Sequence, residues 1–166
     1  MLTLTLAAKL TGAAFLFSSA AVSAFVRKSK DTMRLRRIEA HIAFVRFVRD
    51  RIDRYLSPIA EILRDCDEEI KKGILIGCDA SEFFDIEGLR VLLQSGRFYA
   101  DGGKRFDSYL SSLGSSYREN EVAECDACMN DLKEIQNKLQ KELPRERKSR
   151  NVLSFCFVAA IVIILF

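Results

Sequence analysis

The sequence predicts an all-α protein, a bundle of about five helices flanked by an N-terminal and a short C-terminal transmembrane helix. Three observations predict this fold. Apolar residues in the middle of the 166-residue chain recur at steps of three and four, the period of an amphipathic helix. Both ends of the chain are strongly apolar. Acidic residues occur only between positions 31 and 146, so the charged middle and the apolar ends are separate regions.

Residues 1–26 are expected to form the first transmembrane helix. Leu2 to Val26 contains one charge, Lys9, and is long enough to cross roughly 30 Å of hydrocarbon. The alternative is a cleaved signal peptide, because Val22, Ser23 and Ala24 include the small residues that signal peptidases prefer. The membrane helix is favoured because basic residues follow Val26 at once and oppose translocation of that flank.

Residues 151–166 are expected to form the second, shorter transmembrane helix. Val152 to Phe166 carries no charge, but a helix of that length covers only about 22 Å. Spanning therefore requires local thinning of the bilayer or snorkelling of Arg150. A buried terminal core helix is the alternative, and the uniformly apolar composition of this segment argues against it.

Charge is distributed unevenly and predicts an orientation. Residues 27–58 have a net charge of +6, residues 59–142 of −7 and residues 143–150 of +3. Because both apolar segments have basic flanks, the positive-inside rule predicts that residues 27–150 lie on the cytoplasmic side of the membrane. We expect these flanks to contact anionic lipid rather than nucleic acid. The flanking basic residues are Arg27, Lys28, Lys30, Arg34, Arg36, Arg37, Arg145, Arg147, Lys148 and Arg150.

The first two predicted helices lie between residues 31 and 73. The first carries an apolar stripe, with Arg34, Arg37, Arg49 and Arg51 off it. A second helix is expected to begin at Ser57-Pro58 and to end at Gly73, followed by a connector over residues 74–77. The stripe of the first helix is Leu35, Ile38, Ile42, Val45, Val48, Ile52 and Leu56, and that of the second is Ile59, Ile62, Leu63, Cys66 and Ile70.

The remaining predicted helices follow capping signals and glycines. Asp79 and Glu82 have capping-box spacing for a helix that continues through Leu93, and the Asp101-Gly102-Gly103 segment breaks the chain. A short helix ends at Gly114, and Ser116 with Glu119 caps the longest helix, in which Pro144 is expected to cause a bend or break. The short helix has Phe106, Tyr109, Leu110 and Leu113 on one face, and the longest has Val122, Cys125, Met129, Leu132, Ile135, Leu139 and Leu143.

No catalytic constellation is recognisable, so no enzyme activity and no cofactor are predicted. His41, the only histidine, is interpreted as an ordinary helix residue, and the acidic pairs as a solvated helix face. Cys125 and Cys128 have the spacing of a zinc or redox motif that two further thiols could complete. Since that pair lies within a helical stripe, we interpret the cysteines instead as reduced core residues. The others are Cys66, Cys78 and, in the second apolar segment, Cys156.

The order of these features resembles stage III sporulation protein AB. The resemblance spans nearly the whole chain: an N-terminal membrane helix, an arginine-containing helix, a Ser-Pro turn before an Ile-Ala-Glu-Ile helix, a Leu-Gly pair, a Ser-x-x-Glu start, a long charged helix and an apolar tail. Its most specific part runs from Tyr109 to Phe166. The chain departs from the family in lacking tryptophan and in having no glycine in the last segment, so those packing details do not carry over.

The resemblance implies a non-enzymatic membrane platform of the secretion-like channel between mother cell and forespore. It also implies similarity to the cytoplasmic domain of the type II secretion F protein and contact with a cytoplasmic ATPase and other membrane components. Carried over by position, the candidate interaction residues are Leu113, Gly114, Arg118, Glu119 and Asn120.

Two other classes of function remain as alternatives. The first is a two-helix membrane-anchored sensor or adaptor with a helical ligand-binding domain, which would require that domain outside the membrane. The basic flanks and the short segment after Pro144 argue against it. The second is an enzyme with membrane anchors, for which the sequence offers no catalytic group.

Overall fold

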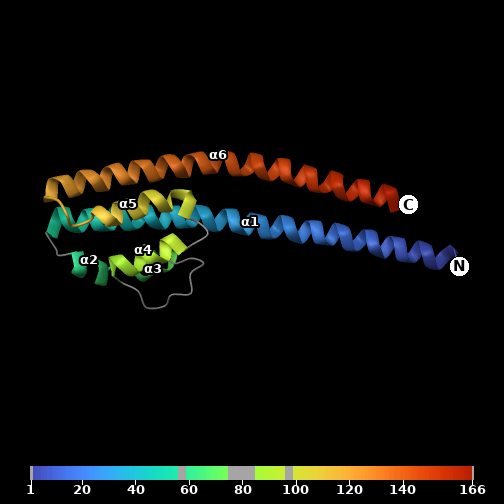
Figure 1. The fold of residues 1–166 in the computed structure, drawn as a ribbon, viewed down its shortest axis with the longest axis horizontal. Coiled ribbons are helices and arrows are strands. Elements are labelled where there is room, and N and C mark those ends of the chain that lie inside the picture. The colour runs from blue at the N-terminus through green and yellow to red at the C-terminus, as the bar shows by residue number, and fades with distance from the viewer. Residues whose placement is uncertain (1, 56–58, 75–84, 96–98, 166) are drawn as a thin grey trace. The chain divides into compact units, whose positions relative to one another are not determined.

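Every regular element that the computed structural model describes is a helix (Figure 1). The structure describes residues 2–55, 59–74, 85–95 and 99–165. The all-α prediction is confirmed for these residues. The helices are α1 (Leu2–Tyr55), α2 (Ile59–Arg64), α3 (Glu68–Ile74), α4 (Ile86–Ser95), the kinked turn η1 (Tyr99–Gly103), α5 (Lys104–Ser112) and α6 (Arg118–Leu165).

The chain forms two compact units, and α1 and α6 contribute to both. Unit 1 contains residues 1–32 and 140–166, and unit 2 contains residues 33–139.

Unit 2 contains one hydrophobic core to which all of its α-helices contribute. The predicted stripe of α1 is buried at Ile38, Ile42, Val45, Val48 and Ile52, and that of α6 at Cys125, Met129 and Leu132. Unexpectedly, α1 is also buried along an adjacent row of its surface, formed by Arg37, Ala40 and Phe44. A second row is buried because other helices cover α1 on more than one side.

Ion pairs join the helices at the edge of this core. Arg49 of α1 binds Asp126 of α6 at 2.7 Å, and Arg105 of α5 binds Asp131 of α6 at 2.7 Å. Arg90 of α4 binds the buried carboxylate of Asp107 at 3.0 Å. Carboxylates on neighbouring helices therefore neutralise these arginines, of which Arg49 was placed beside the apolar stripe by the sequence pattern.

The prediction of a single helix from residue 58 to Gly73 is wrong. The chain leaves the helical conformation between α2 and α3, where the Asp67 carboxylate accepts a hydrogen bond of 2.8 Å from the Glu69 N–H and caps α3. Gly73 does not end α3, which includes Ile74. Instead, a Cβ at Gly73 would lie 2.6 Å from the Ala40 Cβ, so this glycine permits the close approach of α3 to α1.

Helix α4 begins at Ile86 after a bend at Asp85, so the predicted helix does not run unbroken through residue 85. The Asp85 carboxylate accepts a hydrogen bond of 2.7 Å from the Gly88 N–H and so supplies the N-terminal cap. The predicted Asp79–Glu82 capping box, the Ser57-Pro58 turn, Cys78 and residues 75–77 of the connector lie outside the described residues. The predicted break at residues 101–103 is confirmed by the non-helical backbone of Asp101 and Gly102.

Pro144 was expected to bend or break the longest helix. It does not break the helix, because α6 continues through Pro144 to Leu165. A proline removes one helical hydrogen bond, and packing of the flanking turns can compensate for that loss. Leu143 is 3% exposed, and Arg147, three residues after the proline, binds the buried Asp31 carboxylate of α1 at 3.1 Å.

Unit 1 consists of the first part of α1 and the last part of α6, which lie side by side and run in opposite directions (Figure 1). The rings of Phe17 and Phe155 pack against each other with their centroids 6.1 Å apart. No described helix combines the length and the sustained apolar character of a membrane-crossing segment. The described helices therefore do not support the two flanking transmembrane helices expected from the sequence.

Replacing Gly73 with Ala is expected to lower the free energy of unfolding by about 1–3 kcal/mol, because the new methyl group meets the rigidly held Ala40 Cβ. Gly12→Ala is the control, since no atom lies within 4 Å of a Cβ at that position. We expect the control to be neutral or stabilising by up to about 1 kcal/mol. Urea unfolding of the full chain, followed by circular dichroism, measures both. Equal stability of the two variants would contradict the close packing of α3 on α1.

Candidate interaction site at the turn from α5 to α6

The candidate residues from the sequence surround the turn from α5 to α6. Leu113 ends α5 in an extended conformation, and its N–H donates a hydrogen bond of 3.1 Å to the Tyr109 carbonyl. Gly114 follows with a φ of +84°, and a Cβ there would collide with the Ile59 side chain of α2. Both the backbone conformation and the lack of space therefore require glycine, which explains the Leu-Gly pair structurally.

Glu121 fixes the shape of this turn. Its buried carboxylate accepts hydrogen bonds from the Gly114 N–H at 2.9 Å and the Ser116 N–H at 3.0 Å, both to the same oxygen. The predicted capping box of Ser116 and Glu119 is therefore wrong, because α6 begins at Arg118 and Glu119 is exposed. In a capping box, a carboxylate three residues after the cap residue binds the backbone N–H of that residue. The pattern therefore does not predict a carboxylate that binds two N–H groups of the preceding turn.

Arg118 ties the start of α6 to the end of α1. Its guanidinium donates hydrogen bonds to the Asp53 carbonyl and to the Asp53 carboxylate, the latter at 3.0 Å. Both side chains are about half exposed, so the contribution of this pair to stability is small. Arg118 thus has an internal partner, whereas Glu119 and Asn120 are exposed at the start of the same helix.

A polar pocket of about 430 Å³ lies against this turn. The Ser111 and Ser112 hydroxyls donate to backbone carbonyls, so their oxygens can accept further hydrogen bonds. The Glu124 carboxylate also forms an ion pair with the Arg105 guanidinium at 3.0 Å. The pocket therefore contains several hydrogen-bond acceptors and suits a hydrogen-bond donor of a partner. Its lining residues are Ser108, Ser111, Ser112, Ser116, Asn120, Glu121 and Glu124.

The structure thus gives the five predicted interaction residues different roles. Leu113 is buried, Gly114 shapes the turn, and Arg118 binds Asp53, while Glu119 and Asn120 present their side chains to solvent. Sequence reasoning missed the pocket residues Ser108, Ser111, Ser112 and Glu121, which no spacing rule connects. Tyr117, beside them, is 88% exposed and is an aromatic contact available to a partner.

The basic residues flanking the apolar segments are distributed over both units. Arg34 binds the Asp101 carboxylate in unit 2 at 2.6 Å, and Arg37 is 5% exposed. In unit 1, Arg147 binds Asp31 and Arg150 binds Glu146 at 3.2 Å. Several of the basic residues expected to contact lipid therefore have carboxylate partners within the protein. Arg36, Lys28, Lys30, Arg145 and Lys148 are exposed.

His41 is fully buried in unit 2 and stacks on Phe106, with ring centroids 4.2 Å apart. Neither ring nitrogen has a hydrogen-bond partner in the described structure. Burial, assisted by the nearby positive charge of Arg37, lowers the pKa of His41 to about 3. The neutral ring therefore packs as a core aromatic residue, and its isolation from solvent argues against an acid–base role.

The prediction that cysteines pack in the core is confirmed for Cys66, Cys125 and Cys128, which are buried. Burial raises the pKa of Cys66 to about 11, that of Cys128 to about 12 and that of Cys125 above its usual range. The neutral thiols pack in the core, and the Cys125 sulfur lies 3.4 Å from the Tyr109 hydroxyl. Within the described ranges, no three potential ligands gather as a metal site, and Cys156 is exposed.

Comparisons with known proteins give no relative. No protein-family model, no curated protein and no solved structure matches this chain.

Replacing Glu121 with Ala is expected to lower the free energy of unfolding by about 1–3 kcal/mol, because the Gly114 and Ser116 N–H groups lose their acceptor. Glu119→Ala removes an exposed carboxylate from the same helical turn and should change stability by less than about 0.5 kcal/mol. Thermal unfolding of both full-length variants measures the difference. Equal effects would show that Glu121 does not hold the turn.

The loss of folding stability at acid pH is expected to depend partly on His41. The unfolded chain binds a proton at this residue near pH 6.5, whereas the folded chain does so only near pH 3. The stability contributed by the neutral ring is complete above pH 6.5 and is lost as the pH falls toward 3. Between pH 7 and 5 this loss is about 2 kcal/mol.

The His41→Leu variant should lack this component. Urea unfolding at both pH values, for the original chain and the variant, separates it from the titration of carboxylates. The same pH dependence in both proteins would contradict the burial of an unprotonated ring.

Proposed function

We propose that this chain is a non-enzymatic, membrane-anchored docking protein in which unit 1 is the anchor and unit 2 presents the site at the turn from α5 to α6. The observation that carries the proposal is the large apolar surface that unit 1 exposes. Phe15, Phe25, Leu153 and Ile163 are each more than 70% exposed. Many large apolar side chains exposed on one unit are typical of a surface that contacts lipid or another protein.

Hydrogen bonds within α1 make it physically reasonable for this helix to enter a membrane. Each helix contains polar groups that would be costly in lipid unless they were hydrogen-bonded. The Ser18 hydroxyl donates to the Ala14 carbonyl at 2.8 Å, and Arg27 donates to both oxygens of Ser23. The Phe17–Phe155 contact pairs α1 with α6 in unit 1, and we propose that the two helices enter the bilayer together as a hairpin, rather than as two independently sufficient spans.

The positive-inside rule supports a cytoplasmic position for unit 2. Exposed basic residues, including Lys28, Lys30, Arg145 and Lys148, follow or precede the apolar parts of unit 1. On this orientation they contact the anionic surface of the cytoplasmic leaflet. The surplus of acidic residues in the middle of the chain then belongs to the part that faces protein partners.

The pocket beside Glu121 is the proposed docking site. It offers carboxylate and hydroxyl acceptors, and the exposed Tyr117 follows the lining residue Ser116 in the chain. A partner could place a basic side chain in the pocket and pack against Tyr117. Contacts of basic and aromatic side chains are typical of interaction hot spots.

The resemblance to stage III sporulation protein AB supplies a cellular context for the proposal. In that context the anchor holds unit 2 at the mother-cell membrane facing the forespore, and unit 2 docks the cytoplasmic ATPase and other membrane components of the channel. The proposed site coincides with the part of the chain where this resemblance is most specific.

Membrane anchoring is expected to depend on the apolar surface of unit 1. The double variant Phe157→Lys/Ile163→Lys places two charges on residues that are 68% and 77% exposed. We expect most of the protein to move from the membrane pellet to the supernatant on alkaline carbonate extraction, because charges at bilayer depth are unfavourable. Tyr117→Lys changes a still more exposed aromatic residue of unit 2, 88% exposed, and should leave the protein in the pellet. Retention of the double variant would contradict the anchor.

Docking is expected to depend on the start of α6. Glu119→Lys/Asn120→Lys reverses the charge beside the pocket and should reduce copurification with the co-expressed channel ATPase by at least tenfold. Glu134→Lys/Asn137→Lys makes the same changes at exposed positions further along α6 and is the matched control. Equal binding by both variants would place the docking surface elsewhere.

A further inference from the structure

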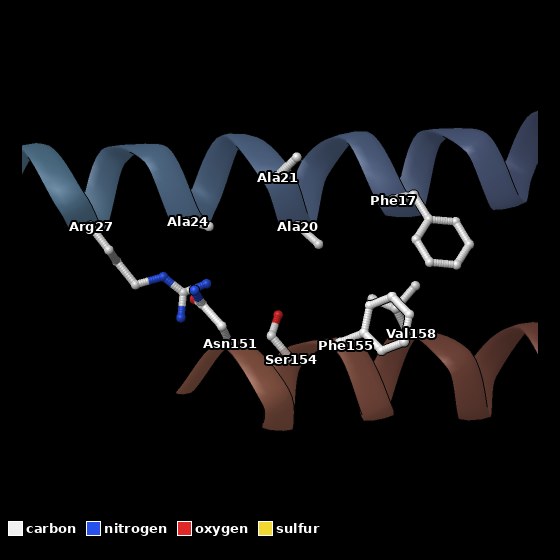
Figure 2. Close-up of a pocket in the computed structure, with 9 residues that line it drawn as sticks. All are labelled: Phe17, Ala20, Ala21, Ala24, Arg27, Asn151, Ser154, Phe155 and Val158. Carbon is white, nitrogen blue, oxygen red and sulfur yellow. The ribbon is translucent and has the colours of Figure 1, made fainter. Parts of the chain in front are cut away.

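Two grooves on unit 1 meet at Arg27. The first has a volume of about 320 Å³ and lies between α1 and α6 (Figure 2). The second has a volume of about 580 Å³ and shares Arg27 and Ser154 with the first. The first is lined by Phe17, Ala20, Ala21, Ala24, Arg27, Asn151, Ser154, Phe155 and Val158, and the second adds Arg150, Leu153, Cys156 and Phe157.

The first groove has one polar and one apolar end. Figure 2 shows the Arg27 guanidinium extending towards Asn151 at one end, and Phe17, Phe155 and Val158 at the other. Alanines of α1 line its middle, and their small side chains leave the space open. An occupant must therefore have a polar group at one end and a hydrocarbon portion along the remainder.

The charge at the polar end is positive and uncompensated. Arg27 donates hydrogen bonds of 3.1 Å to the Ser23 carbonyl and 2.6 Å to the Ser23 hydroxyl, both of which are neutral groups. Within the described residues, no carboxylate forms an ion pair with Arg27, whereas Arg147 and Arg150 have Asp31 and Glu146. The hydrogen bonds thus hold a cation in place at the groove and leave its charge available to an anion.

We propose that the two grooves bind one diacyl phospholipid with a net negative headgroup. Its phosphate binds Arg27 and the Asn151 amide, and one hydrocarbon chain lies along each groove. Two grooves sharing one cation match the two chains and single phosphate of this lipid class, and basic pockets between helices are typical sites for anionic headgroups. This inference rests on the proposed membrane anchoring of unit 1.

The test is lipid retention by the full chain reconstituted in nanodiscs of phosphatidylcholine containing a minor fraction of phosphatidylglycerol. After extraction into mild detergent, native mass spectrometry counts each lipid bound to the protein. We expect one phosphatidylglycerol per chain, enriched over its fraction in the disc. Arg27→Gln should reduce this occupancy about fivefold, because it removes one charge near the headgroup. Lys28→Gln removes a neighbouring exposed charge that lines neither groove, and it should have no effect.

A second variant tests the hydrocarbon part of the site without changing charge. Ala24→Phe fills the first groove and should also reduce phosphatidylglycerol retention, whereas Arg27→Lys should retain most of it. Equal retention of the two lipids by the original chain, or equal losses in Arg27→Gln and Lys28→Gln, would overturn the lipid site while leaving membrane anchoring intact. Failure of the original chain to enter nanodiscs would overturn the anchoring proposal itself.

Discussion

The structure of unit 2 depends on the burial of two adjacent rows of α1. Ile38, Val45 and Val48 form the first row, and Phe44 belongs to the second, and all four are fully buried. One neighbouring helix cannot cover both rows, so the remaining helices must pack around α1 from several sides. The close approach at Gly73 and the stacking of Phe106 on His41 are consequences of this crowding. Sequence changes at those contacts therefore act on α1 itself.

Periodicity was sufficient to predict the first row of α1 and the stripe of α6, because those residues form a pattern within one segment. It could not predict burial of Phe44 or His41, since their burial depends on which other helices lie nearby. The interruption between α2 and α3 at Asp67 and the hydrogen bonds of Glu121 to the turn were not predicted, for a related reason. In both cases one carboxylate satisfies backbone donors, and its effect depends on the path of the loop rather than on hydrophobic spacing.

The candidate site was predictable in position but not in composition. The Leu-Gly pair and the polar residues after it indicated the turn, and the structure assigns Gly114 and Arg118 to holding it. Gly114 has no side chain and the Arg118 guanidinium already binds Asp53, so neither is a good candidate for partner contact. The contact residues that remain, Asn120 and the serines of α5, approach one another only in the folded chain.

In the proposed function, unit 2 is a self-sufficient helical core and unit 1 is an apolar anchor. If this separation is correct, unit 2 requires neither lipid nor unit 1 for folding, because its own helices cover the apolar rows of α1. The most direct test is circular dichroism of a fragment containing residues 33–139 in buffer without lipid or detergent. We predict a helical spectrum and a single cooperative thermal transition. A disordered spectrum or a gradual, non-cooperative loss of signal would contradict the account.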